Sequence, residues 1–289
     1  MAYLLHGCFI CLSLVYPKMI SLCLASVSLG VSADDNVLKV FVLAGQSNME
    51  GQAEVNKTCA TAEPGKCAAP GAVMNGTLVY QLTDPRTATK FAQCWDTATN
   101  NWTVLPSVKI WFNEKGKAAP TPDCPLGCPS ALEDGTFGDL SIGFGCGGYE
   151  NLGARQHIGP EYGAGFALNS ALKGEKILLI KTAWGGKTLC GDFLPPSSAA
   201  NKTLNKTTGF YYTQMLEYVA EILAPENMTK LFPDLSGTPK IVGFGWDQGC
   251  TYSCARYCSG NITQQAPLAC SPTHSSLSRS HVRSRSFRE

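Results

Sequence analysis

Three short apolar runs give the chain its clearest pattern of hydrophobic and polar positions. They cover Val37 to Leu43, Lys176 to Thr182 and Lys240 to Trp246. Each run is almost continuously apolar rather than alternating, which is typical of parallel strands that are covered on both faces of a sheet. We therefore expect three buried strands.

Two segments with helical spacing separate these runs. Pro160 and Glu161 suit the first turn of a helix over residues 160–173, because this turn tolerates a missing N–H group and favours a carboxylate. A second helix is expected over residues 211–223, where apolar side chains recur every three or four positions. The side chains at this spacing are Tyr212, Leu216, Val219 and Leu223. Strands that alternate with helices predict an α/β protein in three layers, α/β/α, around a parallel sheet.

A long segment between the first strand and the first helix, at about residues 52–159, has a different composition. It is rich in glycine, proline, threonine and cysteine and has few periodic stretches. We predict an insertion into the domain that is pinned by disulfide bonds, whose connectivity the sequence leaves open. The cysteines in this segment are Cys59, Cys67, Cys94, Cys124, Cys128 and Cys146.

The first 33 residues have the features of a secretory signal peptide. Apolar stretches lead to Val31 and Ala33, small residues at the positions that signal peptidase recognises. An uncleaved membrane anchor is the alternative, but no single apolar run reaches the ~20 residues that a membrane span requires. We therefore predict cleavage after Ala33 and a mature domain over residues 34–249.

The numbers of cysteines and of glycosylation sequons also indicate a protein of the secretory pathway. The chain has 14 cysteines in 289 residues, which is typical of proteins from oxidising compartments. The net charge of +1 gives no indication of a nucleic-acid partner or of an anionic membrane surface. We expect a secreted or extracellular glycoprotein. Its Asn-x-Ser/Thr sequons begin at Asn56, Asn75, Asn101, Asn201, Asn205, Asn227 and Asn261.

Short motifs rich in glycine and polar residues accompany these elements. GQSNMEG follows the first strand, GPE opens the first helix, WGG follows the second strand and WDQG follows the third. Ligands of parallel α/β sheets bind at the carboxyl ends of the strands, so we expect the three strand-end motifs to meet at one edge. The four motifs resemble the sialate O-acetylesterase and acetylxylan esterase branch of the SGNH (GDSL-like) hydrolases, over about residues 37–249. The resemblance implies a flavodoxin-like α/β/α fold.

The resemblance also implies a set of catalytic roles. Ser47 would be the nucleophile, because a serine at a sharp turn after a strand presents its hydroxyl to a base. The oxyanion of an acyl transfer needs preorganised donors. The backbone N–H of Ser47, that of Gly186 (with Gly185 as the alternative) and the side-chain amide of Gln248 match them. Neither a metal nor an organic cofactor is implied.

Each of these residues also has a purely structural interpretation. Ser47 alone could cap the following helix, and Gly185 and Gly186 could form a simple turn. Gln248 could be a surface amide and Glu161 a carboxylate that stabilises the start of a helix. His157, just before the GPE motif, is more typical of a loop histidine than of a catalytic base. The order of the motifs and their positions at strand ends favour the catalytic interpretation.

The last 40 residues depart from the pattern of the family. Its members carry a general base in a D-x-x-H element near the C-terminus, but neither His274 nor His281 follows an aspartate in this way, so a catalytic Asp and His are not found. Asp247 also takes the place of an aromatic residue. Residues 250–289 are rich in serine and arginine, which is typical of a disordered or out-of-frame tail. We expect the C-terminal part of the fold to be truncated, frame-shifted or altered.

Two functions from different classes are compatible with these features. The first is a secreted carbohydrate O-acetylesterase that removes acetyl groups from sugars through a serine nucleophile, with low activity in a chain without the base. The second is a non-catalytic glycan-binding protein that keeps the pocket. In both cases the expected partner is an acetylated carbohydrate, with no nucleic acid and no membrane beyond the signal peptide.

Overall fold

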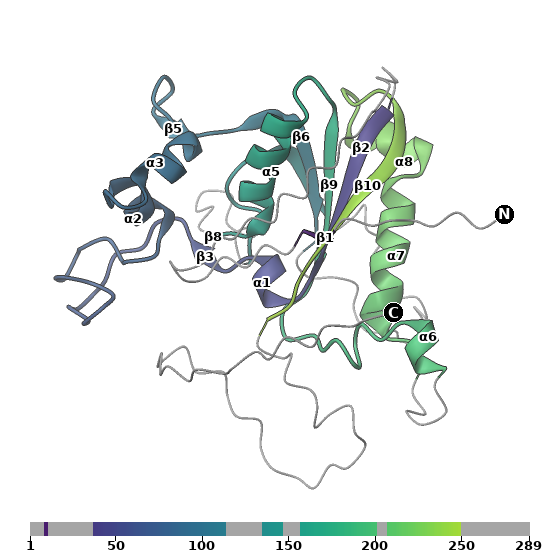
Figure 1. Cartoon of the computed structure of the whole chain (residues 1–289), viewed down its shortest axis with the longest axis horizontal. Helices are drawn as coiled ribbons and strands as arrows, with labels where there is room; N and C mark the ends of the chain where they lie inside the picture. Colours follow the sequence, from purple (N-terminus) through teal and green to yellow (C-terminus); the bar gives the residue numbers. More distant parts are fainter. Residues whose placement is uncertain (1–8, 11–36, 114–134, 147–156, 201–206, 250–289) are drawn as a thin grey trace, which may run out of the picture.

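The chain forms a six-stranded sheet with helices on both faces (Figure 1). The structure is a computed structural model that describes residues 9–10, 37–113, 135–146, 157–200 and 207–249. The strands lie in the order β1-β10-β2-β9-β6-β7. Their bounds are β1 Phe9–Ile10, β2 Val37–Gly45, β6 Leu105–Phe112, β7 Thr136–Leu140, β9 Ile177–Ala183 and β10 Thr238–Asp247.

The centre of the sheet is parallel. Strand β2 lies between β10 and β9 and pairs parallel with both, and β9 pairs parallel with β6. Strand β7 pairs antiparallel with β6 at one edge, so the sheet is mixed and not purely parallel as expected. The α/β fold class predicted from the sequence is confirmed, and the three predicted strands correspond to β2, β9 and β10.

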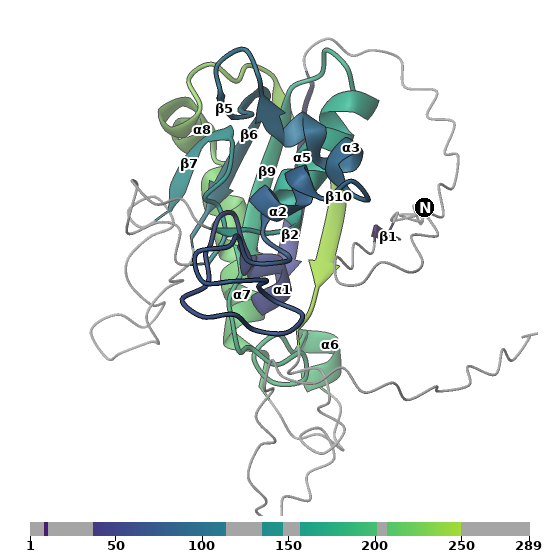
Figure 2. The same ribbon diagram turned by 90° about the vertical axis from the view of Figure 1, so that its left-hand side faces the viewer.

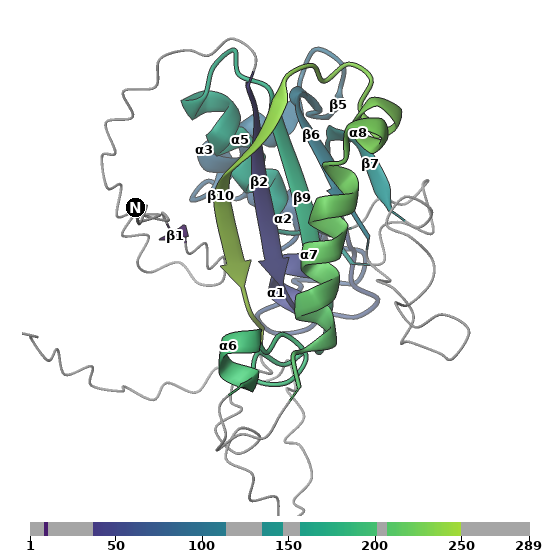
Figure 3. The ribbon, with the colours of Figure 1, turned by 90° about the vertical axis from the view of Figure 1, so that its right-hand side faces the viewer.

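Helices cover the two faces of the sheet and bury two separate clusters of apolar side chains. Helix α5 (Pro160–Ala171) lies on one face, together with α2 (Leu78–Thr83) and α3 (Ala88–Phe91) (Figure 2). Helices α7 (Phe210–Ile222) and α8 (Pro225–Leu231) lie on the other face (Figure 3). Successive side chains of β9 enter alternate clusters, because neighbouring residues of a strand point to opposite faces. Every residue of β9 is buried, as expected for a central strand.

The buried face of α7 matches the predicted stripe except at Leu216, since Tyr212 and Leu223 also pack against the core. The side chain of Leu216, which belongs to the predicted apolar stripe, is 51% exposed. Val219 is buried as expected, and it packs beside Met215, Tyr218 and Ile222. The segment is aromatic or aliphatic at so many positions that its sequence is compatible with more than one face. Contact with the sheet selects among them.

Strand β6 is the largest departure from the sequence-based expectation. It lies inside the segment predicted as an insertion, yet it pairs with β9 in the sheet and carries Trp111, whose side chain is fully buried. Residues 105–112 are therefore part of the domain core. The sequence does not indicate this strand, because Pro106, Ser107 and Lys109 interrupt its apolar pattern.

Strand β7 of the same segment also belongs to the main sheet, and the other described residues of the segment form helices α2 and α3 and several short elements. The short elements are β3 Ala53–Glu54, the 3₁₀ helix η1 Ala92–Cys94, β4 Trp95–Asp96, β5 Asn101–Trp102 and β8 His157–Ile158. Strand β3 pairs with β8, and β4 pairs with β5. A disulfide bond joins Cys59 to Cys67, whereas Cys94, which was also expected to be bridged, has a free and buried thiol. Cys124 and Cys128 lie outside the described residues.

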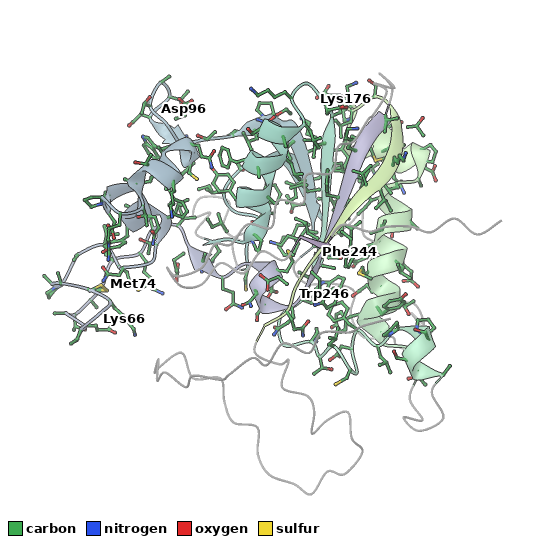
Figure 4. All side chains as sticks on the ribbon, in the orientation of Figure 1. Lys66, Met74, Asp96, Lys176, Phe244 and Trp246 are labelled. Carbon is green, nitrogen blue, oxygen red and sulfur yellow. A yellow bond between two sulfur atoms is a disulfide. The ribbon has the colours of Figure 1, made fainter. Side chains whose placement is uncertain are left out.

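The outer edge of β10 is only slightly covered. Strand β1, which falls within the predicted signal peptide, pairs with β10 over two positions, Phe9 with Phe244 and Ile10 with Gly245. Figure 4 labels Phe244 and Trp246 on this strand. The side chains of Ile241, Val242 and Phe244 are all well exposed, so β10 presents apolar surface that is unusual for a strand of a parallel sheet. The remainder of the predicted leader and the whole predicted tail, residues 250–289, lie outside the described ranges.

Candidate active site

The ends of three neighbouring strands bring the sequence motifs together. In the register of the sheet, Gly45 of β2 lies opposite Asp247 of β10 on one side and opposite Ala183 of β9 on the other. The residues that follow these positions therefore leave the sheet side by side. Ser47, Gly186 and Gln248 thus lie at one edge of the sheet, as the strand-end rule predicts.

The turn that carries Ser47 is held tightly against β10. The backbone N–H of Gln46 donates to the carbonyl oxygen of Asp247 at 3.2 Å. A Cβ atom on Gly45, which has φ +149°, would lie 2.0 Å from that same oxygen, so only glycine allows this approach. Ser47 then begins the short helix α1 (Ser47–Glu50). Its side chain is half-buried, and its Oγ makes no hydrogen bond to any residue that the structure describes.

Two backbone N–H groups from separate loops point at one oxygen atom beside Ser47. The N–H of Ser47 donates to Oε1 of Gln46 at 2.6 Å, and the N–H of Gly186 donates to the same Oε1 at 3.0 Å. Gly186 has φ +74°, a backbone conformation that side chains disfavour. Paired donors at such distances are the arrangement expected of an oxyanion hole. Gly186, rather than the alternative Gly185, makes this hydrogen bond.

The side-chain amide of Gln248, the third expected donor, makes its hydrogen bond elsewhere. Its Nε2 donates to the carbonyl oxygen of Lys187 at 3.0 Å, and its Oε1 is buried without a hydrogen-bond partner among the described residues. Its backbone neighbour Gly249 is very close to the nucleophile, because a Cβ atom there would lie 2.3 Å from Ser47 Oγ. Gln248 is therefore next to the site, while its amide does not reach the oxygen bound by the other two donors.

A buried lysine supports the turn from beneath. Lys181 of β9 is completely buried, and its Nζ donates to the carbonyl oxygens of Glu50 and Phe144 and to Oε2 of Glu161 at 2.7, 2.5 and 2.8 Å. The Glu50 carbonyl is the last one of α1, so this ammonium group holds the helix that begins with Ser47. Lys181 is not among the site residues expected from the sequence, although a lone charge within an apolar strand is a signal of a specific buried partner.

Glu161 has the structural role that its position at a helix start indicates. It is fully buried at the first turn of α5, and its Oε1 accepts a hydrogen bond from the N–H of Gly159 at 2.7 Å. Its other oxygen binds Lys181. The GPE motif therefore ties α5 to β9 and, through Lys181, to the nucleophile turn.

The described part of the chain does not supply a base to Ser47. His157 is its only histidine, and the Nε2 of this residue lies 3.4 Å from Oε2 of Glu54. His274 and His281 lie outside the described ranges. Asp247 accepts a hydrogen bond from Asn48 Nδ2 at 3.4 Å, and burial raises the pKa of its carboxyl group above the usual value. Its side chain thus faces the residue after the nucleophile.

The described ranges contain neither a metal-binding cluster nor a membrane-spanning helix. These residues hold no group of three or more His, Cys, Asp or Glu side chains placed to bind a metal ion. Within the same ranges, no helix has the length and apolar character needed to cross a bilayer.

Comparisons with known proteins give distant structural likenesses. No family model matches the chain, and no curated protein matches it. A carbohydrate acetylesterase from Xanthomonas citri is similar over 73% of this chain and 32% of its own, with 13% identity and a TM-score of 0.34. A protein from Arabidopsis thaliana is similar over 74% of this chain and 58% of its own, with 14% identity and a TM-score of 0.31. The chain thus spans less than two thirds of either protein.

Proposed function

We propose that this protein acts on O-acetylated carbohydrates as a serine esterase of the sialate O-acetylesterase type. The observation that carries the proposal is the convergence of the Ser47 and Gly186 N–H groups on one carbonyl oxygen. An ester carbonyl placed there would put its carbon next to Ser47 Oγ. The two donors would then stabilise the negative charge that develops on its oxygen during acyl transfer.

In the proposed reaction, Ser47 Oγ attacks the acetyl carbonyl and the sugar hydroxyl leaves, which gives an acetyl-enzyme that water hydrolyses to acetate. Both steps require a group that accepts the proton of the attacking hydroxyl or water. None of the described residues provides such a group at Ser47. The oxyanion donors and substrate binding alone account for part of the acceleration, about 10³–10⁴-fold over the uncatalysed reaction in serine hydrolases that lack a triad member.

Acetate release from p-nitrophenyl acetate and from O-acetylated sugars tests this function. We expect the 289-residue chain to release acetate about 10³–10⁴-fold faster than the uncatalysed reaction. Ser47→Ala should remove the part of this rate that passes through the acetyl-enzyme, because no other group of the proposed site can form it. Ser197→Ala, on the exposed surface of α6 (Pro196–Ala199), is the matched control.

Other results would revise the proposal in defined ways. Binding of acetylated glycans without any acetate release would favour the alternative, a non-catalytic glycan-binding protein. Turnover on the order of 1–10³ s⁻¹, which is typical of enzymes, together with a large loss in Ser47→Ala, would show that a base does reach Ser47. Alanine substitution of His157, His274 and His281 in turn would then identify it.

The proposal includes passage through the secretory route. We expect the mature protein to begin at Asp34 and to carry N-linked glycans, because Asn56, Asn75 and Asn101 are exposed in the structure. Sequencing the N-terminus of secreted material, with and without glycosidase treatment, measures both features. Recovery of secreted protein with residues 1–30 intact would contradict the predicted cleavage.

A further inference from the structure

The position that an ester oxygen would take is already filled by a side chain of the protein itself. Gln46 precedes the nucleophile and is 1% exposed. Its Oε1 accepts from the N–H of Ser47, the adjacent residue, and from the N–H of Gly186, which is 140 positions further along the chain. A planar amide carbonyl therefore occupies the place where an acetyl carbonyl would bind.

The neighbouring groups fix the orientation of this amide. Both contacts are made by N–H donors, so only the oxygen of the Gln46 amide can occupy that position, since its NH₂ group would meet two donors without an acceptor. The Nε2 atom lies on the opposite side, towards Gly249, where a Cβ atom would lie 2.2 Å from it. The glycine at position 249 thus leaves space for the amide of Gln46 as well as for Ser47 Oγ.

We propose that Gln46 is an internal ligand of the oxyanion hole, which closes the hole until an acyl carbonyl displaces it. The inference rests on the proposed function and adds a positioning residue to it. While the site is empty, Gln46 keeps the Ser47 and Gly186 N–H groups satisfied and aligned, so that neither buried donor is left without an acceptor. A neutral carbonyl replaces it at similar strength, whereas an oxyanion forms shorter and stronger charge-assisted hydrogen bonds with the same donors. The hole therefore opens for a ligand that carries or develops negative charge.

Substitution of Gln46 by glutamate tests whether the two donors stabilise an anion, independently of catalysis. Gln46→Glu keeps the shape of the side chain and places a carboxylate oxygen on the two N–H groups. If they stabilise negative charge, the pKa of the new carboxyl group falls below the usual value of about 4.3. The unfolded chain then binds more protons than the folded one in this range. The added stability is therefore present above about pH 4.3 and is lost as the pH falls through the lowered pKa.

Gln214→Glu is the matched control. Gln214 of α7 is fully buried, and neither atom of its amide group has a hydrogen-bond partner among the described residues. A carboxyl group there has no described donors, so burial raises its pKa. The control should be most stable below about pH 4.3 and should lose stability as the pH rises through the raised value. Urea unfolding gives the free energy of unfolding of each variant, taken as its difference from the unchanged protein. Plotted against pH between pH 3 and pH 7, this difference should have slopes of opposite sign for the two variants. If Gln46→Glu follows the slope of Gln214→Glu, the proposal is overturned.

Acetate, the expected product, tests whether Gln46 closes the hole. Titration calorimetry with sodium acetate, against sodium chloride at equal ionic strength, should show about 10-fold tighter acetate binding by Gln46→Ala than by the unchanged protein, because two hydrogen bonds no longer have to be broken. Gln46→Glu should bind no acetate, since its own carboxylate fills the hole. Equal affinities in the unchanged protein and Gln46→Ala would overturn the proposal.

The outcomes also separate this inference from the proposed function. Opposite pH slopes and tighter acetate binding without any acetate release would support the internal ligand and contradict the esterase. Acetate release by the unchanged protein, with parallel pH slopes in the two glutamate variants, would support the esterase and contradict the internal ligand.

Discussion

Lys181→Met is expected to lower the free energy of unfolding by about 3–5 kcal/mol, the usual cost of removing one partner of a buried ion pair. The carboxylate of Glu161 would keep its hydrogen bond from Gly159 N–H but lose its positive partner in a fully buried position. The carbonyl oxygens of Glu50 and Phe144 would lose the Nζ donor as well. Chemical denaturation with urea at pH 7 measures the change.

Two further variants separate the charge effect from simple loss of a lysine. Lys230→Met, at an exposed position at the end of α8, should stay within about 0.5 kcal/mol of the unchanged protein. Lys181→Met combined with Glu161→Gln removes both charges, and Gln can still accept from Gly159 N–H. The double variant should therefore recover part of the loss. A Lys181→Met protein as stable as the Lys230→Met protein would show that the ion pair does not support the fold.

Trp111→Ala is expected to cost about 3–5 kcal/mol, the range for large aromatic side chains in a core. The ring of Trp111 is fully buried and packs edge-on against Tyr218 of α7, with ring centroids 5.2 Å apart. It also lies against the backbone of Gly135, where a Cβ atom would come within 2.1 Å of Trp111 Nε1. Truncation would leave a cavity between β6 and α7, and thermal or urea unfolding would measure the loss.

Leu216→Ala provides the comparison on the same helix. Leu216 is half-exposed, so its truncation should change stability by no more than about 0.5 kcal/mol. A similar small effect for Trp111→Ala would mean that β6 does not contribute to the core and that residues 52–159 behave as an insertion throughout.

The central strands could be predicted because their signal is local. A run such as Val37–Gly45 is apolar at every position except Lys39, and in a sheet covered on both faces such a run has few alternatives. Strand β6 lacks this signal. Its Lys109 is accommodated by an ion pair with Asp139 of the neighbouring strand, a contact 30 residues away that a local pattern does not reveal. The exposure of Leu216 on α7 has a similar reason, since packing on the sheet rather than spacing alone selects which side chains are buried.

In the candidate site, too, the positions of the residues could be predicted from the sequence, whereas their individual contacts could not. The strand-end rule placed Ser47, Gly186 and Gln248 at one edge of the sheet, because that rule depends only on strand order and direction. The partners of individual atoms could not be predicted. The hydrogen bond from Gly186 to Gln46 depends on the φ of one glycine and on one side-chain rotamer, and Gln248 turns instead to the carbonyl of Lys187. The roles of these residues in catalysis stay predictions.

The buried thiol of Cys94 can be used to measure local opening of the folded protein. Burial raises its pKa to about 11, so almost none of it is thiolate at neutral pH, and alkylating reagents react with the thiolate. Cys94 lies in the same cluster as Tyr162 of α5 and Leu105 of β6. Its alkylation in the native protein therefore requires these elements to separate. The rate of that reaction, compared with the rate of global unfolding, reports whether the α5 face of the sheet opens as an independent unit.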